Sequence, residues 1–532
     1  MGQNFVSGGS PDQVYLLPPD AREWLPAGHL AWAMLEQAAG LDLAPFLARY
    51  RADGQGPPAY HPQMMVALVM YCLCKGVRSS RAMEMATFDD LGARVICGNL
   101  HPDHSTVARF VGRHEQAVKG LLVASLVACA REGLVSVEVV AGDGTKVKAS
   151  ASMAANVTAE QLDLDIAELE ALIAAEVDGW LAQARAEDAA EEALLGGDGD
   201  GPGRRGGPGT LARTADRLAR ARQARARLAA GEAAARQDAE QARQDKTARL
   251  EARAARHRAR AADLEAQAAA RVADYQARAA DKAAAGSRKR PDGRVPAGPG
   301  DSAAVRRARQ AADQAERDLA AARAAPAPPA GPARPPKANT TDPGSRVMPA
   351  KHGGFVQGYN PQIVAARSQV ILSITAHDSP ADVAALHPAL AAARASLDAA
   401  GITDPISKAL FDAGYASEDN FTAPCEAELY VAITREARQT GRLRDGPPPA
   451  SSLPGWQQMT ARLDTPQGKA LYRQRAGIIE PVFAQLFARL GRQLNYRGTR
   501  VGLELHLWAA THNFLKAIRH HSNRQATPAP AT

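Results

Sequence analysis

The sequence of 532 residues has few cysteines and no long apolar segment. Its five cysteines form no Cys-x-x-Cys pair, which argues against disulfides or a zinc site and favours buried thiols in a reducing cytoplasm. The longest wholly apolar run, from Met64 to Cys74, has 11 residues, whereas a membrane-spanning helix needs roughly 20. No basic patch followed by an apolar stretch opens the chain, so we expect a soluble protein without a secretory signal.

Motifs of several enzyme classes are also missing. The chain has no Gly-x-Ser-x-Gly, no Gly-x-x-x-x-Gly-Lys-[Ser/Thr] and no zinc-ligand spacing. These absences argue against a serine hydrolase, a P-loop nucleotidase and a zinc enzyme.

Charge is concentrated in two adjacent blocks of opposite sign. Residues 160–192 carry eleven acids and one base, and residues 210–290 carry 20 Lys/Arg and 10 Asp/Glu. Apolar spacing in the first block and Ala/Arg composition in the second predict helices. We expect an antiparallel hairpin over 155–325, with the acidic arm paired to the basic arm and a flexible turn at 196–209. The longer arm must overhang, break or also pair with 303–324; the alternative is a partly disordered insert.

The segment 20–134 has the pattern of a small helical domain. Ser79 or Ser80 and Ser105 are plausible N-caps of its second and third helices. The predicted helices are 60–77, 79–90 and a third within 101–132 that starts at Ser105. Short helices with a tight turn fit a helix-turn-helix-like DNA-binding domain in which Arg109 and Arg113 contact DNA. A solvated face of an ordinary helical bundle is the alternative for these two arginines.

The remaining sequence predicts an α/β core around a mixed sheet, formed by 135–154 and 341–520. Alternating or β-branched runs predict strands at 135–150, 353–366, 368–379, 406–417 and 427–436. We expect helices at 381–401 and from about 468 past 480. The other predicted segments are an N-terminal tail (1–19), a Pro-rich linker (326–340) and a disordered tail (521–532).

Three acids stand out by their placement in this core. Asp143 and Asp412 each end a predicted strand and are followed by glycine within two residues, and Glu480 lies among apolar residues on a helix. Strand ends are where α/β sheets present functional groups, and a carboxylate amid apolar neighbours needs a partner or a metal. Taken singly, each acid also fits an ordinary turn, cap or solvated helix position.

The motifs around these acids resemble the DDE transposases of bacterial insertion sequences, in the eleven-eighty-two group. The matching segments are YHPQMMVALVMYCLCKGVRSSRAME (60–84), PDHSTVARF (102–110), DGTKVKASAS (143–152), TDPGSRVM (341–348), GGFVQGYNPQ (353–362), FDAGYAS (411–417) and YRQRAGIIEPVFAQL (472–486). The resemblance implies a ribonuclease H-like core with a mixed five-stranded sheet and helices. It also implies that Asp143, Asp412 and Glu480 bind Mg²⁺ or Mn²⁺, with two ions expected.

The signature of the third acid also contains Tyr472 and Arg475, one turn apart on the expected helix, and Arg475 is a candidate for holding a phosphate by a bidentate fork. Lys146 and Lys148 share one strand face and are further candidate phosphate contacts. One departure concerns the position seven residues after Glu480, usually basic in the family. It is Phe487 here, with Arg489 as the nearest base.

The implied activity is cleavage of DNA at transposon ends and strand transfer into target DNA. The implied partners are terminal inverted repeats, target DNA and further copies of the chain, in a bacterial, nucleoid-associated cytoplasmic setting. Two alternatives remain: an inactive transposase derivative that still binds DNA, and a structural coiled-coil protein whose working part is the insertion. We expect the hairpin to serve dimerisation or DNA gripping.

Overall fold

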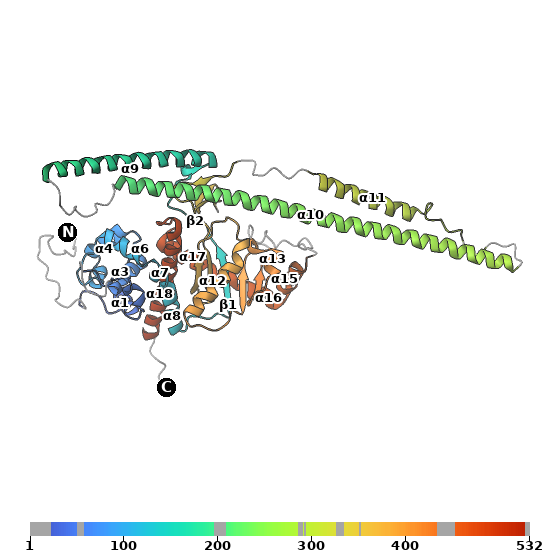
Figure 1. Ribbon diagram of the computed structural model, residues 1–532. Coiled ribbons are helices and arrows are strands. Elements are labelled where there is room, and N and C mark those ends of the chain that lie inside the picture. The colour runs from blue at the N-terminus through green and yellow to red at the C-terminus, as the bar shows by residue number, and fades with distance from the viewer. Residues whose placement is uncertain are drawn as a thin grey trace, which may run out of the picture. The chain divides into compact units, whose positions relative to one another are not determined.

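The structure, a computed structural model, forms two compact units (Figure 1). It describes residues 23–50, 58–195, 209–285, 291, 294–325, 335–350, 353–433 and 453–526. The core unit comprises Met1–Asn156 with Asn339–Thr532, and the helical unit comprises Val157–Ala338. The predicted N-terminal tail and the 196–208 part of the predicted turn lie outside the described residues. None of the described helices combines the length and apolarity needed to cross a membrane.

The N-terminal part of the core unit is helical. Its helices are α1 (Leu30–Ala39), α2 (Ala44–Leu47), α3 (Pro62–Cys74), α4 (Ser80–Asp89), α5 (Leu91–Ile96), α6 (His104–Arg113), α7 (Glu115–Lys119) and α8 (Leu121–Arg131). Pro62 occupies the first turn of α3, where its missing N–H costs nothing. Ser79 caps α4 by accepting a hydrogen bond from the backbone N–H of Ala82 at 3.2 Å.

The helix predicted within 101–132 was wrong in its start and its continuity. The structure divides this segment into α6, α7 and α8. Asp103, not Ser105, is the N-cap of α6, because its carboxylate accepts from the backbone N–H groups of Ser105 and Thr106 at 2.9 and 3.0 Å. A carboxylate at this position also complements the positive end of the helix dipole.

A mixed five-stranded sheet forms the centre of the core unit and confirms the predicted sheet. Its strands are β1 (Val139–Gly144), β7 (Gln362–Ala366), β8 (Ile371–Thr375), β9 (Lys408–Phe411) and β10 (Glu428–Val431). They lie in the order β10-β9-β1-β7-β8. β7 is antiparallel to β1 and β8, whereas β9 is parallel to β1 and β10. The carboxyl ends of β1, β9 and β10 therefore share one edge.

Two segments predicted as single strands are each divided in two. The first, 135–150, forms β1 and β2 (Val147–Lys148), and the second, 353–366, forms β6 (Phe355–Tyr359) and β7. Pro361 separates β6 from β7, since it has no N–H to donate to a strand ladder. Strand β2 leaves the main sheet and joins β6 and β5 (Arg346–Pro349) in a three-stranded sheet, in the order β2-β6-β5.

Helices from the later part of the chain pack against the five-stranded sheet. Those following β8 are α12 (Leu386–Ala399), α13 (Glu418–Thr422), α15 (Pro454–Asp464), α16 (Pro466–Tyr472), α17 (Gln474–Leu490) and α18 (Val501–Ala526). α17 packs against β1 and β7, while α12 and α18 pack against β8. On α17 the buried side chains Ile478, Ile479 and Val482 supply the apolar face for this contact.

The last helix is longer than expected. The prediction of a disordered tail from 521 was wrong for 521–526, which continue α18; residues 527–532 lie outside the described part of the chain. Near this stretch, His520 and His521 lie 3.4 and 2.9 Å from Glu132, the C-cap residue of α8, so a charged partner contacts the final turns. Midway along α18, buried Asn513 donates to Ile371 O and accepts from Ile371 N on β8, both at 2.9 Å.

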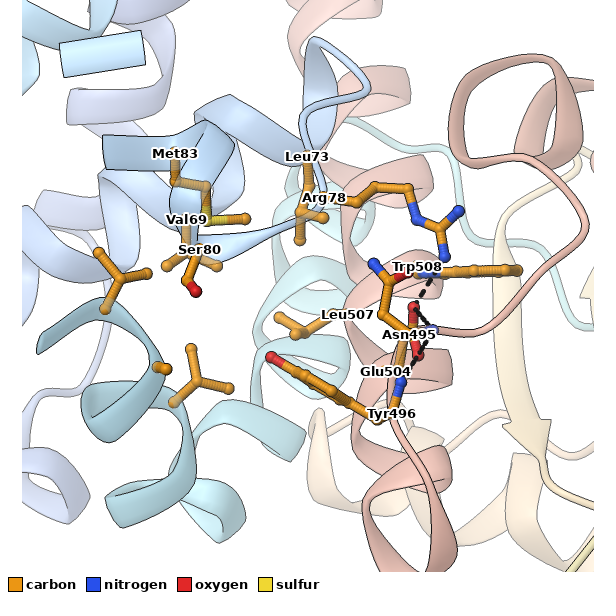
Figure 2. Close-up of a pocket in the computed structure, with 13 residues that line it drawn as sticks. Val69, Leu73, Arg78, Ser80, Met83, Asn495, Tyr496, Glu504, Leu507 and Trp508 are labelled. Carbon is orange, nitrogen blue, oxygen red and sulfur yellow. Dashed lines mark hydrogen bonds and ion pairs between the residues drawn. The ribbon is translucent and has the colours of Figure 1, made fainter. Parts of the chain in front are cut away.

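An ion pair between half-buried Arg78 and buried Glu504 joins the N-terminal helices to α18 (Figure 2). Arg78, between α3 and α4, places Nη2 2.9 Å from Glu504 Oε1. Glu504 also accepts from the backbone N–H groups of Asn495 and Tyr496, both at 2.8 Å. The Arg78 guanidinium lies 5.1 Å from the ring centroid of Trp508, and Figure 2 shows it beside that ring. The charge of Glu504 is thus compensated on several sides, as a buried carboxylate requires.

The helical unit consists of α9 (Ala159–Leu195), α10 (Gly209–Ala284) and α11 (Ala303–Ala324). α10 packs against both α9 and α11. Between α9 and α10, Arg222 pairs with Glu170 at 2.6 Å and Arg225 with Asp163 at 2.8 Å. Further along α10, Arg–carboxylate pairs of the same kind join it to α11, so two helices pack against the long helix. The chain enters and leaves this unit through two short paired strands, β3 (Asn156–Val157) and β4 (Ala338–Asn339). β4 occupies the end of the segment predicted as a Pro-rich linker, and residues 326–334 of that segment lie outside the described residues.

Candidate active site

Asp143 and Asp412 lie side by side because of the register between two parallel strands. Ala141 of β1 is opposite Leu410 of β9, so two residues further along each strand Asp143 comes level with Asp412. Side chains two residues apart on a strand point to the same face. Two acids separated by 269 positions in the chain therefore meet at the carboxyl edge of the sheet.

Glycine permits this close approach of β1 to β9. A Cβ atom on Gly142 would lie 2.1 Å from Cε1 of Phe411, well inside contact distance. A Cβ on Gly144 would lie 2.4 Å from Nε2 of Gln362 and 2.6 Å from Oδ1 of Asp382. Both strand-end glycines are thus required by neighbours that crowd the backbone beside Asp143.

Backbone N–H groups orient both carboxylates. Asp143 Oδ1 accepts from the N–H of Gly144 at 2.8 Å, and Asp412 Oδ1 accepts from the N–H of Gly414 at 2.7 Å. The second bond caps the short 3₁₀ helix Ala413–Tyr415. In each case Oδ1 is held by the backbone, and the two Oδ2 atoms face a common space beside α17.

A single guanidinium occupies that space. Nη2 of Arg475, in the first turn of α17, lies 2.9 Å from Asp143 Oδ2 and 3.8 Å from Asp412 Oδ2. Burial raises the pKa of Asp143, and the nearby Asp412 raises it further, while Arg475 opposes the rise. Burial lowers the pKa of Arg475, but the carboxylates outweigh this effect and its pKa is raised overall. Arg475 is therefore a charged partner of the acids in this structure.

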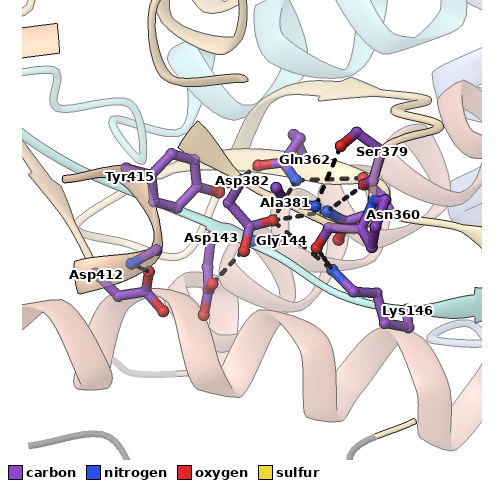
Figure 3. Close-up of polar contacts among 12 residues, drawn as sticks. Asp143, Gly144, Lys146, Asn360, Gln362, Ser379, Ala381, Asp382, Asp412 and Tyr415 are labelled. Atoms are coloured by element: carbon purple, nitrogen blue, oxygen red, sulfur yellow. Dashed lines mark hydrogen bonds and ion pairs between the residues drawn. The ribbon is translucent and has the colours of Figure 1, made fainter. Parts of the chain in front are cut away.

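A second network beside Asp143 is built around Asp382, a residue not predicted from the sequence (Figure 3). Asp382 Oδ1 accepts from Asn360 Nδ2 at 2.6 Å and from Gln362 Nε2 at 3.0 Å. The hydroxyl of buried Tyr415 donates to Gln362 Oε1. Lys146 Nζ lies 3.9 Å from the same Asp382 oxygen and donates to Pro380 O at 2.9 Å. Asp382 lies seven residues after the end of β8, just before the short 3₁₀ helix Val383–Ala385 and within the segment predicted as the helix 381–401, so no local pattern marked it as a site residue.

Glu480 does not join this cluster in the structure. Its side chain is exposed on α17, five residues beyond Arg475, which is about 140° around an α-helix. Among the described residues, no group of three or more His, Cys, Asp or Glu side chains is arranged to hold a metal ion. The structure thus brings together two of the three predicted acids.

The other residues of the predicted signature fall on two helices. Tyr472 ends α16 and Arg475 lies at the start of α17, with the boundary at Arg473. The expectation of one helix carrying both was therefore wrong. Phe487 stacks on Phe483, and the guanidinium of Arg492 lies 4.1 Å from the ring centroid of Phe487.

Three of the predicted DNA contacts differ in their surroundings. Lys146 lies beside the acids, as described, whereas Lys148 is exposed on β2 in the three-stranded sheet. Arg489 is half-buried near the C-terminal end of α17. Burial lowers its pKa, Cys74 opposes this shift and Arg519 adds to it, so the pKa of Arg489 is lowered overall. The structure places Lys146 alone of these three at the Asp143 network.

The two arginines predicted to bind DNA lie on α6, and both are exposed. Arg109 Nη2 donates to the hydroxyl of Thr106 at 3.2 Å, a contact within its own helix. Arg113 donates to the backbone oxygen of Arg49 and lies 5.0 Å from the ring centroid of Tyr50. The Arg113 guanidinium is therefore held by the turn that follows α2, while Arg109 is exposed and contacts its own helix.

The donor set of the acid pair fits a small divalent cation. Asp143 and Asp412 offer hard carboxylate oxygens that already converge on one positive charge. Mg²⁺ is commonly held by one or two carboxylates, with water and substrate phosphate completing its octahedral shell. The two residues are thus suited to bind such an ion at the position of the Arg475 guanidinium.

Comparison with known families yields two matches, and in the sequence Asp143 and Asp412 lie between the two matched segments. Residues 19–113 match a family described as a transposase domain (DUF772), and residues 455–518 match one described as a transposase DDE domain. No curated protein and no solved structure matches the chain. The first match covers most of the N-terminal helices and the second covers α15 to most of α18, with Tyr472, Arg475, Glu480 and Arg489. Together the matches support a transposase function, and the second indicates an enzyme of the DDE type with divalent-metal dependence.

Proposed function

We propose that this chain is an active insertion-sequence transposase of the eleven-eighty-two group, with a ribonuclease H-like core, and that Asp143 and Asp412 hold its catalytic Mg²⁺ or Mn²⁺. The observation that carries the proposal is the β1–β9 register, which sets the two carboxylates side by side around one cation. The mixed sheet with flanking helices supports the core assignment. The two matched domains support the order of a DNA-binding part followed by a catalytic part.

The chemistry follows from what these residues can do. When bound at the acid pair, divalent ions supply Lewis-acid activation of the attacking oxygen and stabilisation of the leaving oxygen in phosphodiester displacement. Asp143 and Asp412 position that charge, and the backbone N–H groups of Gly144 and Gly414 fix their orientation. A second ion needs more oxygen ligands, for which we propose Glu480 and the substrate phosphate.

Glu480 is retained as the third acid on the strength of the family resemblance. Its support in the structure is its place on α17, the helix that packs against β1 and already delivers Arg475 to Asp143. Its side chain is exposed on this helix, so the carboxylate is accessible to a metal ion.

Positive side chains, together with the Tyr472 hydroxyl, are proposed to guide the DNA. Lys146, beside the acids, contacts the phosphate next to the cleaved bond; Lys148, Tyr472, Arg475 and Arg489 remain proposed contacts along the DNA end. On the N-terminal helices, exposed Arg109 and Arg113 of α6 are proposed to bind the terminal inverted repeat. Phosphate contacts of this kind give affinity that falls steeply with salt.

The biological setting completes the proposal. The protein acts on inverted repeats and target DNA as a homo-oligomer assembled on DNA, since two element ends must be held together. We place this activity in the bacterial cytoplasm, at the nucleoid. The helical unit is proposed to contribute to assembly or to grip DNA.

Strand transfer with the flanking inverted repeats and Mg²⁺ tests the proposed function. The wild-type chain should join the repeat ends to target DNA, and Asp412→Asn should lower the rate by at least about 100-fold, because a ligating carboxylate is lost. Asp419→Asn is the matched control, since Asp419 is an exposed acid on α13. Full activity of Asp412→Asn would overturn the assignment, and salt-dependent DNA binding without cleavage by wild type would identify an inactive derivative.

A further inference from the structure

The cation at the centre of the acid pair belongs to the protein itself. Arg475 Nη2 lies within ion-pair distance of Oδ2 on both Asp143 and Asp412. Only 12% of the Arg475 side chain is exposed. The guanidinium therefore fills the position at which the two carboxylates would meet a metal ion.

The guanidinium is poorly satisfied at this position. Its Nε and Nη2 atoms are buried and have no hydrogen-bond acceptor among the described residues. The 2.9 Å contact with Asp143 is an ion pair without the alignment of a hydrogen bond, and the bidentate fork that makes arginine–carboxylate pairs strong is absent. A buried donor without an acceptor is costly, so this arrangement neutralises charge without binding the carboxylates optimally.

The local charges explain why a cation is needed even without a metal. Asp143 and Asp412 are two like charges at adjacent strand ends, and Asp382 adds a third beside Asp143. Lys146 lies near Asp382, which leaves Arg475 as the positive group between the other two acids. Repulsion between Asp143 and Asp412 would otherwise oppose the β1–β9 register.

From these observations we infer that Arg475 is a placeholder cation, which holds the Asp143–Asp412 pair together in the metal-free protein and must leave it when a divalent ion binds. The inference rests on the proposed function and adds to it a residue that sets metal affinity. Arg475 and the metal ion compete for the same two oxygens, so removal of the guanidinium strengthens metal binding. The displaced guanidinium is then available to a DNA phosphate, the role that the sequence pattern suggested.

The test measures Mn²⁺ binding to the full chain, without DNA, by the electron paramagnetic resonance signal of free Mn²⁺. Arg475→Gln should bind Mn²⁺ about tenfold more tightly than wild type, since an adjacent opposite charge is worth one or more pKa units to a carboxylate. Arg475→Lys, which keeps the charge on a more flexible stem, should fall between the two. Arg473→Gln is the matched control, because Arg473 is exposed two residues away.

A second readout protects the test against simple misfolding. In EDTA, Arg475→Gln should melt below wild type because the acid pair has lost its cation, and saturating Mn²⁺ should raise its melting temperature by more than it raises that of wild type. A purely structural arginine would lower the melting temperature without increasing metal affinity.

The outcomes separate the inference from the proposed function. Wild-type binding that is abolished by Asp143→Asn but is equal or weaker in Arg475→Gln would overturn the placeholder role and leave the metal site intact. Absence of Mn²⁺ binding in both wild type and Arg475→Gln would overturn the placeholder role together with the proposed site. Tighter binding in Arg475→Gln that is lost in Arg475→Gln/Asp143→Asn would support both.

Discussion

The Arg78–Glu504 pair gives a quantitative prediction about how the N-terminal helices are held to the core. Arg78→Met removes the cation and keeps much of the apolar stem, so Glu504 is left as a buried carboxylate without its charged partner. Breaking a buried pair from one side costs about 3–5 kcal/mol. We expect about 3 kcal/mol at pH 7, because Glu504 keeps its hydrogen bonds from the N–H groups of Asn495 and Tyr496.

The pH dependence of this loss has a definite sign. Burial raises the pKa of Glu504 above its ordinary value, while the two backbone N–H groups and Arg78 partly oppose the rise. Without Arg78 the pKa rises further, so the folded variant binds a proton over a wider pH range than the unfolded chain. The stability deficit of Arg78→Met should therefore be small near the ordinary pKa of glutamate and grow as pH increases through the raised value.

Urea unfolding of the full chain between pH 4.5 and 8, followed by tryptophan fluorescence, measures this deficit. Glu504→Gln is the companion variant, because its amide oxygen can still accept a backbone hydrogen bond while Arg78 retains its contact with Trp508. Glu504→Gln should cost less than Arg78→Met at pH 8, and the double variant should show strong coupling. A deficit of Arg78→Met below about 1 kcal/mol that does not change with pH would refute this account of the pair.

Three further predictions follow from the site and the division into units. In a thermal melt, Gly142→Ala should destabilise the chain by about 1–3 kcal/mol through overpacking against Phe411, and it should also reduce DNA cleavage. The control Gly179→Ala, at an open position on α9, should be neutral or stabilising in the same melt. Glu480→Gln should lower Mg²⁺-dependent cleavage by about 100-fold or more while changing metal-free Tm little, because the side chain is exposed; unchanged cleavage would remove Glu480 from the proposed ligands. Joining Asn156 to Asn339 through a short glycine linker should leave a folded core unit, since β3 and β4 pair where the chain crosses between units. Circular dichroism and light scattering check this deletion: aggregation or loss of the cooperative melt would contradict it, and an unchanged number of chains per particle would exclude a dimerisation role for the helical unit.

Local patterns predicted the strands better than their connections. β-branched alternation located β1, β8, β9 and β10, and the acids at the ends of β1 and β9 marked the edge where the site forms. The pattern did not show where the chain leaves one sheet for the other, between β1 and β2 and between β6 and β7. These breaks depend on the partner strands and on Pro361, and an alternating sequence pattern contains no information about partner strands. The start of α6 was misplaced because Asp103 and Ser105 are both good caps, and in the structure it is the Asp103 carboxylate that accepts from the backbone N–H groups at the start of the helix.

The composition of the site was only partly predictable. The resemblance supplied Asp143, Asp412 and Glu480 as a set, but which side of α17 faces β1 is decided by the packing of Ile478, Ile479 and Val482, and that packing presents Arg475. Asp382 was missed because it falls within the predicted helix 381–401, and its importance comes from Asn360, Gln362 and Lys146, which reach it from elsewhere in the chain. Chain order identifies candidate acids, whereas their partners depend on the assembled sheet.

The most direct test of the central claim locates the metal ion on the polypeptide. Fe²⁺ in place of Mg²⁺, with ascorbate and peroxide, generates radicals that cut the backbone close to the bound ion. We predict cuts next to Asp143 and Asp412 in the full chain, suppressed by excess Mg²⁺ and lost in Asp143→Asn. Cuts confined to other segments, or cuts beside these acids that persist in Asp143→Asn, would contradict the assignment of this pair as the metal site.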